Sequence, residues 1–285
     1  MTTIQRILDH HGALALPGLF DALSARIAQR AGCPMGFVSG YSVAATALGE
    51  PDLGLLTQTE IVAQARRICK SVEIPVLVDA DTGYGNALNA YRTVEELIDA
   101  GAAGCFLEDQ VWPKRCGHMA DKRIVERGEY LERIRAAVAA RGDRDFFIVA
   151  RSDAEAVAGL DEAIDRVGAA HALGANACFV EAPGSRDQLA EIGRRTPGPR
   201  VANMIEGGKT PLLSREVLGE MGFQLILYPL TGLFGAARAM RDLCARLMAD
   251  GTSAGVEDQL MDFDSFNELI GVEERLELVR RLQQG

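Results

Sequence analysis

The alternation of short apolar runs with longer amphipathic segments is the feature that most constrains the fold of this chain. Eight runs have the length and composition of buried strands, and each precedes a segment with helical spacing. The expected strands are 13–18, 36–40, 75–81, 104–110, 146–153, 177–183, 200–205 and 224–230. The expected helices lie near 21–32, 57–72, 87–101, 126–141, 159–174, 186–196, 214–222 and 232–251. This count and order predict an α/β fold of the (β/α)₈ TIM-barrel type.

An open doubly wound sheet explains the pattern less well, because it usually has fewer strands and a glycine-rich turn after the first one. No GxGxxG follows the first expected strand here. We therefore predict a catalytic barrel domain over 1–251. The remaining 252–285 has helical stretches near 264–271 and 273–283 and exposes Phe263, Phe266, Leu269 and Ile270. These side chains need a surface to pack on, so we predict a C-terminal helical oligomerisation tail.

Composition and charge limit the classes of partner. Of 285 residues, 48% are hydrophobic and 25% charged, as in globular proteins. A net charge of −10 without Lys/Arg clusters argues against nucleic acid. The six cysteines have no CxxC spacing, so we expect neither a zinc site nor a disulfide framework. With no signal-like start and no apolar run of 18 residues, we expect no membrane partner and a cytoplasmic location.

The stretch 75–85 reads Pro-Val-Leu-Val-Asp-Ala-Asp-Thr-Gly-Tyr-Gly, a buried strand that leads into two carboxylates and a turn. Residues two apart on a strand point to the same side, so Asp79 and Asp81 should converge if the strand continues that far. Two close carboxylates repel each other unless a cation or a shared proton lies between them. The alternative is a pair of loop-capping aspartates.

Polar residues also follow the other strands, at the end where barrel enzymes place their chemistry. They are Ser39, Gly40, Tyr41, Ser42, Asp52, Glu108, Asp109, Arg151, Ser152, Asp153, Glu181, Asn203 and Glu206. Each one alone could be a turn, cap or surface residue. Together they predict one site that is rich in carboxylates. Oxygen ligands without histidine favour Mg²⁺, or else Mn²⁺, over zinc.

The loop after the fourth strand contains Trp-Pro-Lys-Arg-Cys-Gly-His at 112–118. Cations and an imidazole on either side of Cys116 are expected to lower the pKa of its thiol, which makes it a candidate nucleophile or proton donor. Alternatively, Cys116 is an incidental loop cysteine and His118 faces solvent. The other histidines, His10, His11 and His171, are interpreted as structural.

Together, Asp79-Ala-Asp-Thr-Gly-Tyr-Gly and Lys114-Arg-Cys-Gly-His resemble the isocitrate lyase and phosphoenolpyruvate mutase superfamily, and the resemblance covers essentially the whole chain. Lys-Arg-Cys-Gly-His is the signature of the lyase branch, whereas the mutase branch lacks Cys-Gly-His. The segments 202–211 and 266–270 are similar to members that cleave 2,3-dimethylmalate. Lyases acting on isocitrate or methylisocitrate carry a glycine where this chain has Tyr41, which implies a smaller substrate than a tricarboxylate.

The resemblance also implies an assembly and a set of roles. The assembly is a homotetramer of dimers in which the last barrel helix is exchanged between subunits. Asp79 would bind Mg²⁺, while Asp52, Asp81 and Glu108 would hold its water ligands. The implied substrate-binding residues are Ser39, Gly40, Tyr41, Gly117, Arg151, Glu181 and Asn203. Cys116 would be the general acid on a gating loop, and Arg151, Lys114 and His118 complete the implied catalytic set.

The expected activity is therefore Mg²⁺-dependent carbon–carbon cleavage of a small 2-hydroxy dicarboxylate. A 2-alkylmalate such as 2,3-dimethylmalate would yield a 2-keto acid such as pyruvate and a simple carboxylic acid. Three alternatives stay open. They are hydrolysis or decarboxylation of oxaloacetate, cleavage of methylisocitrate, and a non-catalytic barrel that binds a metabolite.

Overall fold

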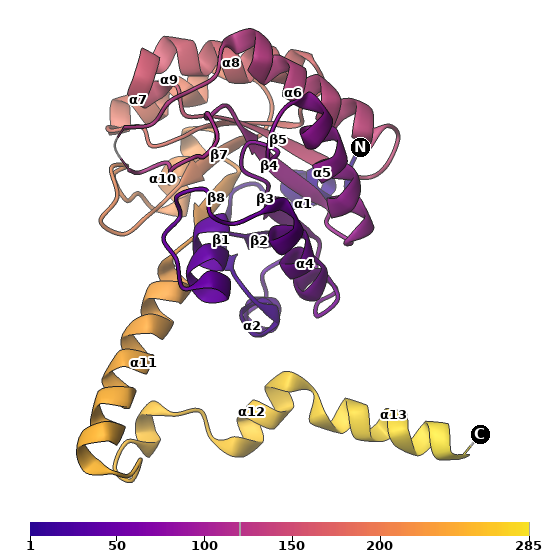
Figure 1. Ribbon diagram of the computed structural model, residues 1–285, viewed down its shortest axis with the longest axis vertical. Coiled ribbons are helices and arrows are strands. Elements are labelled where there is room, and N and C mark those ends of the chain that lie inside the picture. The colour runs from indigo at the N-terminus through magenta and orange to yellow at the C-terminus, as the bar shows by residue number, and fades with distance from the viewer. Residues whose placement is uncertain (120, 285) are drawn as a thin grey trace. The chain divides into compact units, whose positions relative to one another are not determined.

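The computed structural model describes residues 1–119 and 121–284, and its strands form a closed parallel barrel in the order β1 to β8 (Figure 1). The strands are β1 Leu14–Leu19, β2 Gly36–Val38, β3 Val76–Asp79, β4 Gly104–Glu108, β5 Phe147–Ser152, β6 Ala177–Val180, β7 Arg200–Asn203 and β8 Leu225–Tyr228. The predicted TIM-type barrel is confirmed. Each strand lies in its predicted place, with ends that differ by a few residues at most.

Helices α2 to α10 alternate with the strands and surround the barrel (Figure 1), while α1 precedes β1 and most of α11, with α12 and α13, belongs to a second unit. Their bounds are α1 Thr3–His11, α2 Ala22–Arg30, α3 Gly40–Val43, α4 Gln58–Cys69, α5 Ala87–Asp99, α6 Arg127–Arg141, α7 Glu155–Ala158, α8 Leu160–Ala172, α9 Arg186–Arg195, α10 Arg215–Glu220, α11 Thr231–Asp250, α12 Phe263–Ile270 and α13 Val272–Gln284. A π-helical segment, Ala44–Leu48, follows α3, and a 3₁₀ turn, Glu257–Gln259, precedes α12.

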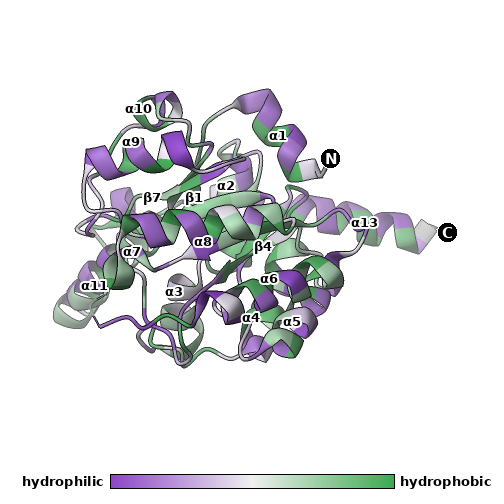
Figure 2. Cartoon of the chain, turned by 90° about the horizontal axis from the view of Figure 1, so that it is seen from above, coloured by the Kyte–Doolittle hydropathy of each residue, from purple (hydrophilic) through white to green (hydrophobic). Residues whose placement is uncertain are grey.

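The barrel closes where β1 pairs with β8, from Leu14 opposite Leu225 to Pro17 opposite Tyr228. Inward side chains from every strand form one buried cluster, which also includes Ile4 and Leu8 of α1. The sequence pattern did not predict α1. In Figure 2 the strands at the centre are coloured as hydrophobic, whereas α9 at the rim is mostly hydrophilic. Because these apolar side chains fill the interior of the barrel, the strand ends can carry polar side chains without loss of the core.

Side-chain caps fix the points at which the loops end and the outer helices begin. Asp21, Thr57 and Asn86 each accept a hydrogen bond from a backbone N–H in the first turn of α2, α4 and α5. Ser185 and Ser214 do the same for α9 and α10. Such caps satisfy N–H groups that have no partner inside a helix. They therefore hold the loops above the strand ends in defined positions.

The chain divides into two compact units, Met1–Gly232 and Leu233–Gly285. In the second unit the side chains of Phe263, Phe266 and Ile270 are exposed, whereas Leu269 is buried. The expectation of an exposed Leu269 is therefore wrong. The role of the tail in oligomerisation remains a prediction. No helix within residues 1–119 and 121–284 combines the length and apolarity needed to cross a membrane.

Candidate active site

The polar residues at the strand ends gather around one cavity at the carboxyl-terminal mouth of the barrel. Of the predicted site residues, those that line it are Ser39, Tyr41, Asp52, Asp79, Cys116, Gly117, His118, Arg151 and Asn203. Those that lie one contact behind the lining are Gly40, Asp81, Glu108, Lys114 and Glu181. The free space is about 30 Å³, enough for no more than a few water molecules. The cavity is therefore narrow in this conformation.

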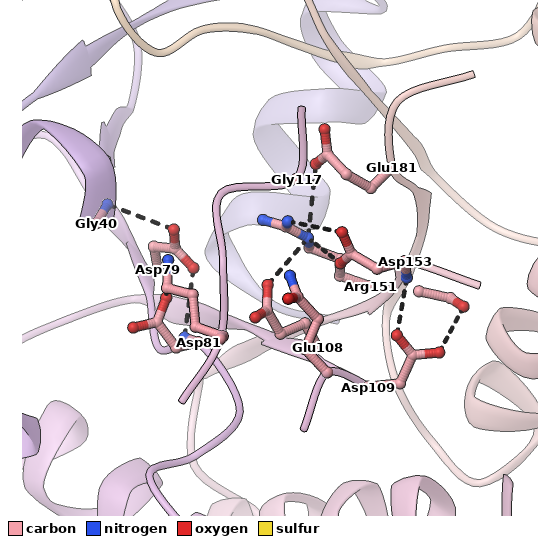
Figure 3. Close-up of polar contacts among 12 residues, drawn as sticks. Gly40, Asp79, Asp81, Glu108, Asp109, Gly117, Arg151, Asp153 and Glu181 are labelled. Atoms are coloured by element: carbon pink, nitrogen blue, oxygen red, sulfur yellow. Dashed lines mark hydrogen bonds and ion pairs between the residues drawn. The ribbon is translucent and has the colours of Figure 1, made fainter. Parts of the chain in front are cut away.

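Three aspartates meet one lysine on the β3 side of the cavity. Lys114 Nζ lies 2.7 Å from Oδ1 of Asp52 and 2.8 Å from Oδ1 of Asp81. Asp79 accepts hydrogen bonds from the backbone N–H groups of Gly40, at 3.3 Å, and Asp81, at 3.4 Å (Figure 3). The two aspartates do converge, but not by strand alternation. β3 ends at Asp79, and Asp81 has a left-handed φ of 46° that brings its carboxylate back.

Burial raises the pKa of Asp81 to about 7, and Lys114 opposes that rise while Asp79 and Asp52 add to it. Glu108, at the end of β4, is buried as well, and burial holds its pKa well above the usual range. Neither carboxylate oxygen of Glu108 has a hydrogen-bond partner, although Arg151 Nε lies 3.2 Å from Oε2. Among the residues that the structure describes, Lys114 is the one cation in an ion pair with Asp52 and Asp81, and Asp79 lies beside them without an ion pair. This side of the site therefore carries excess buried negative charge, which protons or a cation would stabilise.

These residues fit a hard cation that is held mainly through water. Carboxylate oxygens and water are the ligands that Mg²⁺ prefers, and the Glu108 oxygens are available to accept hydrogen bonds. Among the residues that the structure describes, no three His, Cys, Asp or Glu side chains are arranged to hold a metal ion directly. A site with one direct carboxylate ligand, as expected for Asp79, agrees with that arrangement.

Arg151, at the end of β5, is the centre of a second buried network (Figure 3). Its Nε lies 2.9 Å from Asp153 Oδ2, 3.2 Å from Glu108 Oε2 and 3.5 Å from Glu181 Oε2. The guanidinium carbon lies 5.5 Å from the centre of the Phe179 ring. Burial alone would raise the pKa of Asp153, but Arg151 and a second cation, Lys122, hold it below its usual range. Arg151 is thus fixed with its charge balanced.

Cys116 lines the cavity, but the expectation of a lowered thiol pKa is wrong. Burial, and then Asp52, raise the pKa of Cys116 to about 11, and the backbone N–H of His118 and the charge of Lys114 oppose that rise only in part. Lys114 is paired with Asp52 and Asp81, and the imidazole of His118 faces Glu181. The thiol is therefore protonated at neutral pH, which suits a proton donor and not a nucleophile.

His118 joins two loops above the cavity and does not face solvent. Its Nε2 lies 3.0 Å from Oε1 of Glu181, and its Nδ1 accepts a hydrogen bond from the backbone N–H of Lys209 at 3.0 Å. Asn203 Nδ2 lies 3.4 Å from both oxygens of Glu181, while the buried Oδ1 of Asn203 has no partner. Because Nδ1 accepts, the proton of a neutral His118 ring is on Nε2. An amide oxygen is left free to accept from a ligand.

Ser39, Gly40 and Tyr41 come from the turn between β2 and α3. Ser39 caps α3 through a 3.3 Å hydrogen bond from the N–H of Ser42, so its cap role is structural even though it lines the cavity. The remaining lining is apolar and consists of Phe37, Phe106, Phe179, Ile205, Leu227, Pro229 and Leu230. Part of a ligand in this cavity would therefore meet hydrocarbon.

The sequence patterns missed the buried cation Lys122 and misjudged the carboxylate of Asp109. Lys122 donates to Gly117 O and to Asp153 Oδ1, and nothing in the local sequence distinguishes it from a surface lysine. Asp109 accepts from the Ser152 hydroxyl, at 2.7 Å, and from the backbone N–H of Asp153, at 2.8 Å. It also pairs with Arg166, so Asp109 anchors β5 and does not line the cavity.

A larger cavity of about 530 Å³ lies elsewhere, between α4 and α5. Exposed cations, among them Arg66, Arg67 and Arg92, surround it, and no strand-end residue reaches it. The titratable groups that perturb one another lie at the barrel mouth, and such groups mark functional sites better than cavity size does. We therefore place the candidate active site at the mouth.

Comparison with curated proteins gives relatives over the length of the chain. Carboxyvinyl-carboxyphosphonate phosphorylmutase, chloroplastic, of Arabidopsis thaliana is 49% identical, covering 98% of this chain and 84% of that protein. Petal death protein of Dianthus caryophyllus is 50% identical, with 97% and 87% covered. 2,3-Dimethylmalate lyase of Eubacterium barkeri is 42% identical, with 99% and 98% covered. Because these names include a mutase and a lyase, the reaction has to be argued from the site.

Solved structures agree closely with the fold. Oxaloacetate acetylhydrolase in complex with 3,3-difluorooxalacetate has a TM-score of 0.92 at 35% identity, covering 98% of this chain and 96% of that chain. 2,3-Dimethylmalate lyase, described as a PEP mutase/isocitrate lyase superfamily member, has 0.92 at 35%, with 98% and 94% covered. Phosphonopyruvate hydrolase in complex with oxalate and Mg²⁺ has 0.86 at 29%, with 99% of both chains covered.

A family model, Phosphoenolpyruvate phosphomutase, matches residues 4–248, which span the barrel and most of α11. The predicted resemblance is confirmed by this match and by the identities to petal death protein and 2,3-dimethylmalate lyase. The family match, the sequence identities and the shared barrel fold lead to the same assignment. The chain belongs to the isocitrate lyase and phosphoenolpyruvate mutase superfamily of enzymes.

Proposed function

We propose that this protein is a Mg²⁺-dependent lyase that cleaves a carbon–carbon bond in a 2-hydroxy dicarboxylate of the 2-alkylmalate type. The products are a 2-keto acid and a simple carboxylic acid. One observation carries the proposal. A protonated thiol, Cys116, and a fixed guanidinium, Arg151, line the same narrow cavity beside the excess carboxylates of β3 and β4. The 42% identity to 2,3-dimethylmalate lyase supports it.

Asp79 would bind Mg²⁺ directly, and Asp52, Asp81 and Glu108 would hold its water ligands, with Mn²⁺ as the other candidate. The solved structure of phosphonopyruvate hydrolase in complex with oxalate and Mg²⁺, which has the same fold, supports a metal-dependent reaction. Bound there, the ion supplies Lewis acidity that stabilises negative charge on the substrate oxygens. The excess of carboxylates over Lys114 is the feature of this chain that favours a cation.

The reaction needs two proton transfers with opposite directions. The substrate hydroxyl gives its proton to a general base among the carboxylates of the site. Its oxygen forms the new carbonyl, and the carbon–carbon bond breaks with its electron pair moving to the carbon of the departing acid. Cys116 gives its thiol proton to that carbon. Arg151 stabilises the charge that develops on the departing carboxylate, and a well-placed donor of this kind contributes about 3 kcal/mol. The narrow cavity limits the access of water to the carbanion.

The lining favours a dicarboxylate with an alkyl group over a tricarboxylate. Among the described residues, Lys114 is paired with Asp52 and Asp81, and Arg151 is surrounded by Glu108, Asp153 and Glu181. A third substrate carboxylate would add negative charge with no further cation in the cavity lining to meet it. The apolar side, which includes Ile205, Pro229 and Leu230, suits an alkyl substituent instead.

Hydrolysis of oxaloacetate to oxalate and acetate is the second candidate. A specific observation favours it, since oxaloacetate acetylhydrolase has the same fold with a TM-score of 0.92. Oxaloacetate has no alkyl substituent and would leave the apolar side of this cavity empty. For that reason we rank it below alkylmalate cleavage.

A coupled pyruvate assay on 2,3-dimethylmalate, methylisocitrate and oxaloacetate tests the proposal. The enzyme is treated with EDTA, dialysed and assayed with and without added Mg²⁺, and oxalate and acetate are measured in parallel. Pyruvate formed from dimethylmalate only when Mg²⁺ is present supports the lyase. Oxalate and acetate from oxaloacetate alone would favour the hydrolase. No turnover of any substrate, together with measurable substrate binding, would identify a non-catalytic metabolite-binding barrel.

A further inference from the structure

Lys122 is a buried cation with two fixed partners. Its side chain is 1% exposed, and its Nζ donates to the backbone carbonyl of Gly117 at 2.6 Å and to Asp153 Oδ1 at 2.7 Å. Burying an ammonium group away from water costs free energy unless such partners replace the lost contacts with water. Lys122 does not line the cavity, so it does not contact a ligand there.

The two partners of Lys122 belong to different parts of the site. Gly117 lies between Cys116 and His118, on the turn that covers the mouth. Asp153 is the carboxylate that receives Arg151 Nε at 2.9 Å and its terminal nitrogen at 3.2 Å. One ammonium group therefore connects the turn that carries the thiol to the carboxylate that holds the guanidinium. These contacts span the loop after β4 and the end of β5.

The turn at Gly117 is packed directly on the same network. A Cβ at this position would lie 2.6 Å from the terminal nitrogen of Arg151 and 2.4 Å from Cγ of Glu181. The turn thus sits against Arg151 and Glu181 with no space between them. At the start of the segment, Lys114 is fixed separately by Asp52 and Asp81. The turn therefore forms one wall of the narrow space of about 30 Å³ beneath it.

We propose that Lys122 is a positioning residue that holds the Cys116–His118 turn in place by bonding Gly117 to the Asp153–Arg151 pair. Its effect on catalysis rests on the proposed function, whereas its effect on the turn does not. The bond to the Gly117 carbonyl and the ion pair to Asp153 together fix the turn against the Arg151 network. Lys122 therefore sets the position of the thiol relative to Arg151.

The test compares Lys122→Met with Arg123→Met, which removes the same charge from an exposed neighbour. The first readout is the rate at which iodoacetamide alkylates Cys116, followed on its own peptide by mass spectrometry at several pH values. We expect the rate at pH 8 to rise about 10-fold or more in Lys122→Met and to stay at the wild-type value in Arg123→Met. Loss of a nearby cation raises a thiol pKa and slows alkylation, so a faster rate reports access to the thiol and not a change in its pKa.

The second readout is steady-state kinetics on the substrate found by the pyruvate assay. Misplacing a reacting group by about 1 Å can cost 10²-fold in rate, so we expect kcat to fall about 10- to 100-fold in Lys122→Met. KM should stay within about 3-fold, because the groups that line the cavity are unchanged. Ethylammonium, which carries N–H donors, should restore part of kcat in Lys122→Ala. Tetramethylammonium, which has none, should not.

Lys122→Gln keeps an N–H donor without the charge, and it serves as the second variant if Lys122→Met does not fold. The alkylation rate of Cys116 in Lys122→Gln should be higher than in the wild-type protein. Where Lys122→Met also folds, the rate in Lys122→Gln should be the lower of the two. Wild-type alkylation and kcat in folded Lys122 variants would overturn the proposal. If the wild-type enzyme cleaves none of the substrates, the proposed function fails while the alkylation rates still decide the role of Lys122.

Discussion

Cys116 shows how the surroundings of a side chain, and not its neighbours along the chain, set its chemistry. Lys114, Arg115 and His118 are adjacent in sequence, yet Lys114 is paired with two aspartates and His118 with Glu181. Burial then dominates and keeps the thiol protonated. A carbanion produced by bond cleavage needs a proton from a fixed donor, and a thiol in this state can supply it.

The first prediction replaces the thiol. Cys116→Ser keeps the approximate size but raises the pKa of the donor, so kcat should fall about 10²-fold or more. KM should change no more than a few-fold, because the carboxylate-binding groups are untouched. Cys244→Ser, at an exposed cysteine, is the matched control and should leave both values unchanged. If Cys116→Ser retains wild-type kcat on every alkylmalate and on oxaloacetate, the thiol is not the proton donor.

The second prediction concerns pH. A donor acts only while it is protonated, and the pKa of Cys116 is raised from an ordinary value near 9.0 to about 11. Loss of the proton should therefore reduce kcat only as pH rises toward about 11, and kcat should not decline between pH 7 and pH 9 through this group. The pH profile of kcat checks this. A decline centred near pH 8.5 that disappears in Cys116→Ser would contradict it.

The third prediction concerns Asp79. Asp79→Ala removes the expected direct ligand, and carboxylates in the outer shell do not replace it. Activity should be lost, and added Mg²⁺ should fail to restore it. Glu50→Gln, at an exposed carboxylate in the loop after α3, is the control and should retain activity. Full turnover by wild-type enzyme that has been made free of metal would rule out the metal requirement.

At the scale of elements, the regular features could be predicted and the irregular ones could not. Alternation of apolar runs locates the eight strands because each buried strand needs a continuous run of apolar residues. The turn at Asp81 could not be read in that way, because a left-handed aspartate has no periodic signal. Lys122 was missed because its partner Asp153 is 31 residues away. Such contacts are set by the closed barrel and not by local sequence.

The fourth prediction tests the closure between β1 and β8. A Cβ at Gly18 would lie 2.1 Å from the backbone oxygen of Pro229. Any residue larger than glycine at position 18 would therefore prevent β1 from packing this closely against the end of β8. Gly18→Ala should lower the free energy of unfolding by about 1–3 kcal/mol, as overpacking does. Gly168→Ala, in α8 with nothing within 4 Å of the added atom, should raise it by up to about 1 kcal/mol. Urea denaturation at one protein concentration measures both, and equal effects would contradict the closure argument.

At the scale of the whole molecule, the barrel unit contains every residue of the candidate site. The second unit differs in that it exposes many large apolar side chains. Exposed large apolar side chains recur along 260–282, among them Phe263 at 79% and Leu282 at 73%, and such a concentration marks an interaction surface. We propose that they are covered in a homotetramer in which a helix is exchanged within each dimer. The cytoplasmic location also remains a prediction, since one relative is named as chloroplastic.

The last prediction tests this assembly. Removing 252–285 deletes α12 and α13 with their exposed apolar side chains, and it leaves the surface that receives them on another subunit without its cover. The truncated chain should therefore aggregate or lose oligomeric mass in light scattering. Phe263→Asp combined with Phe266→Asp should weaken the assembly without removing the segment, because a carboxylate buried at an apolar contact is costly. Glu273→Gln, at an exposed position in α13, should keep the wild-type mass. A soluble, fully active monomer from the truncated chain would exclude a role for the tail in assembly, and it would confine the whole activity to the barrel.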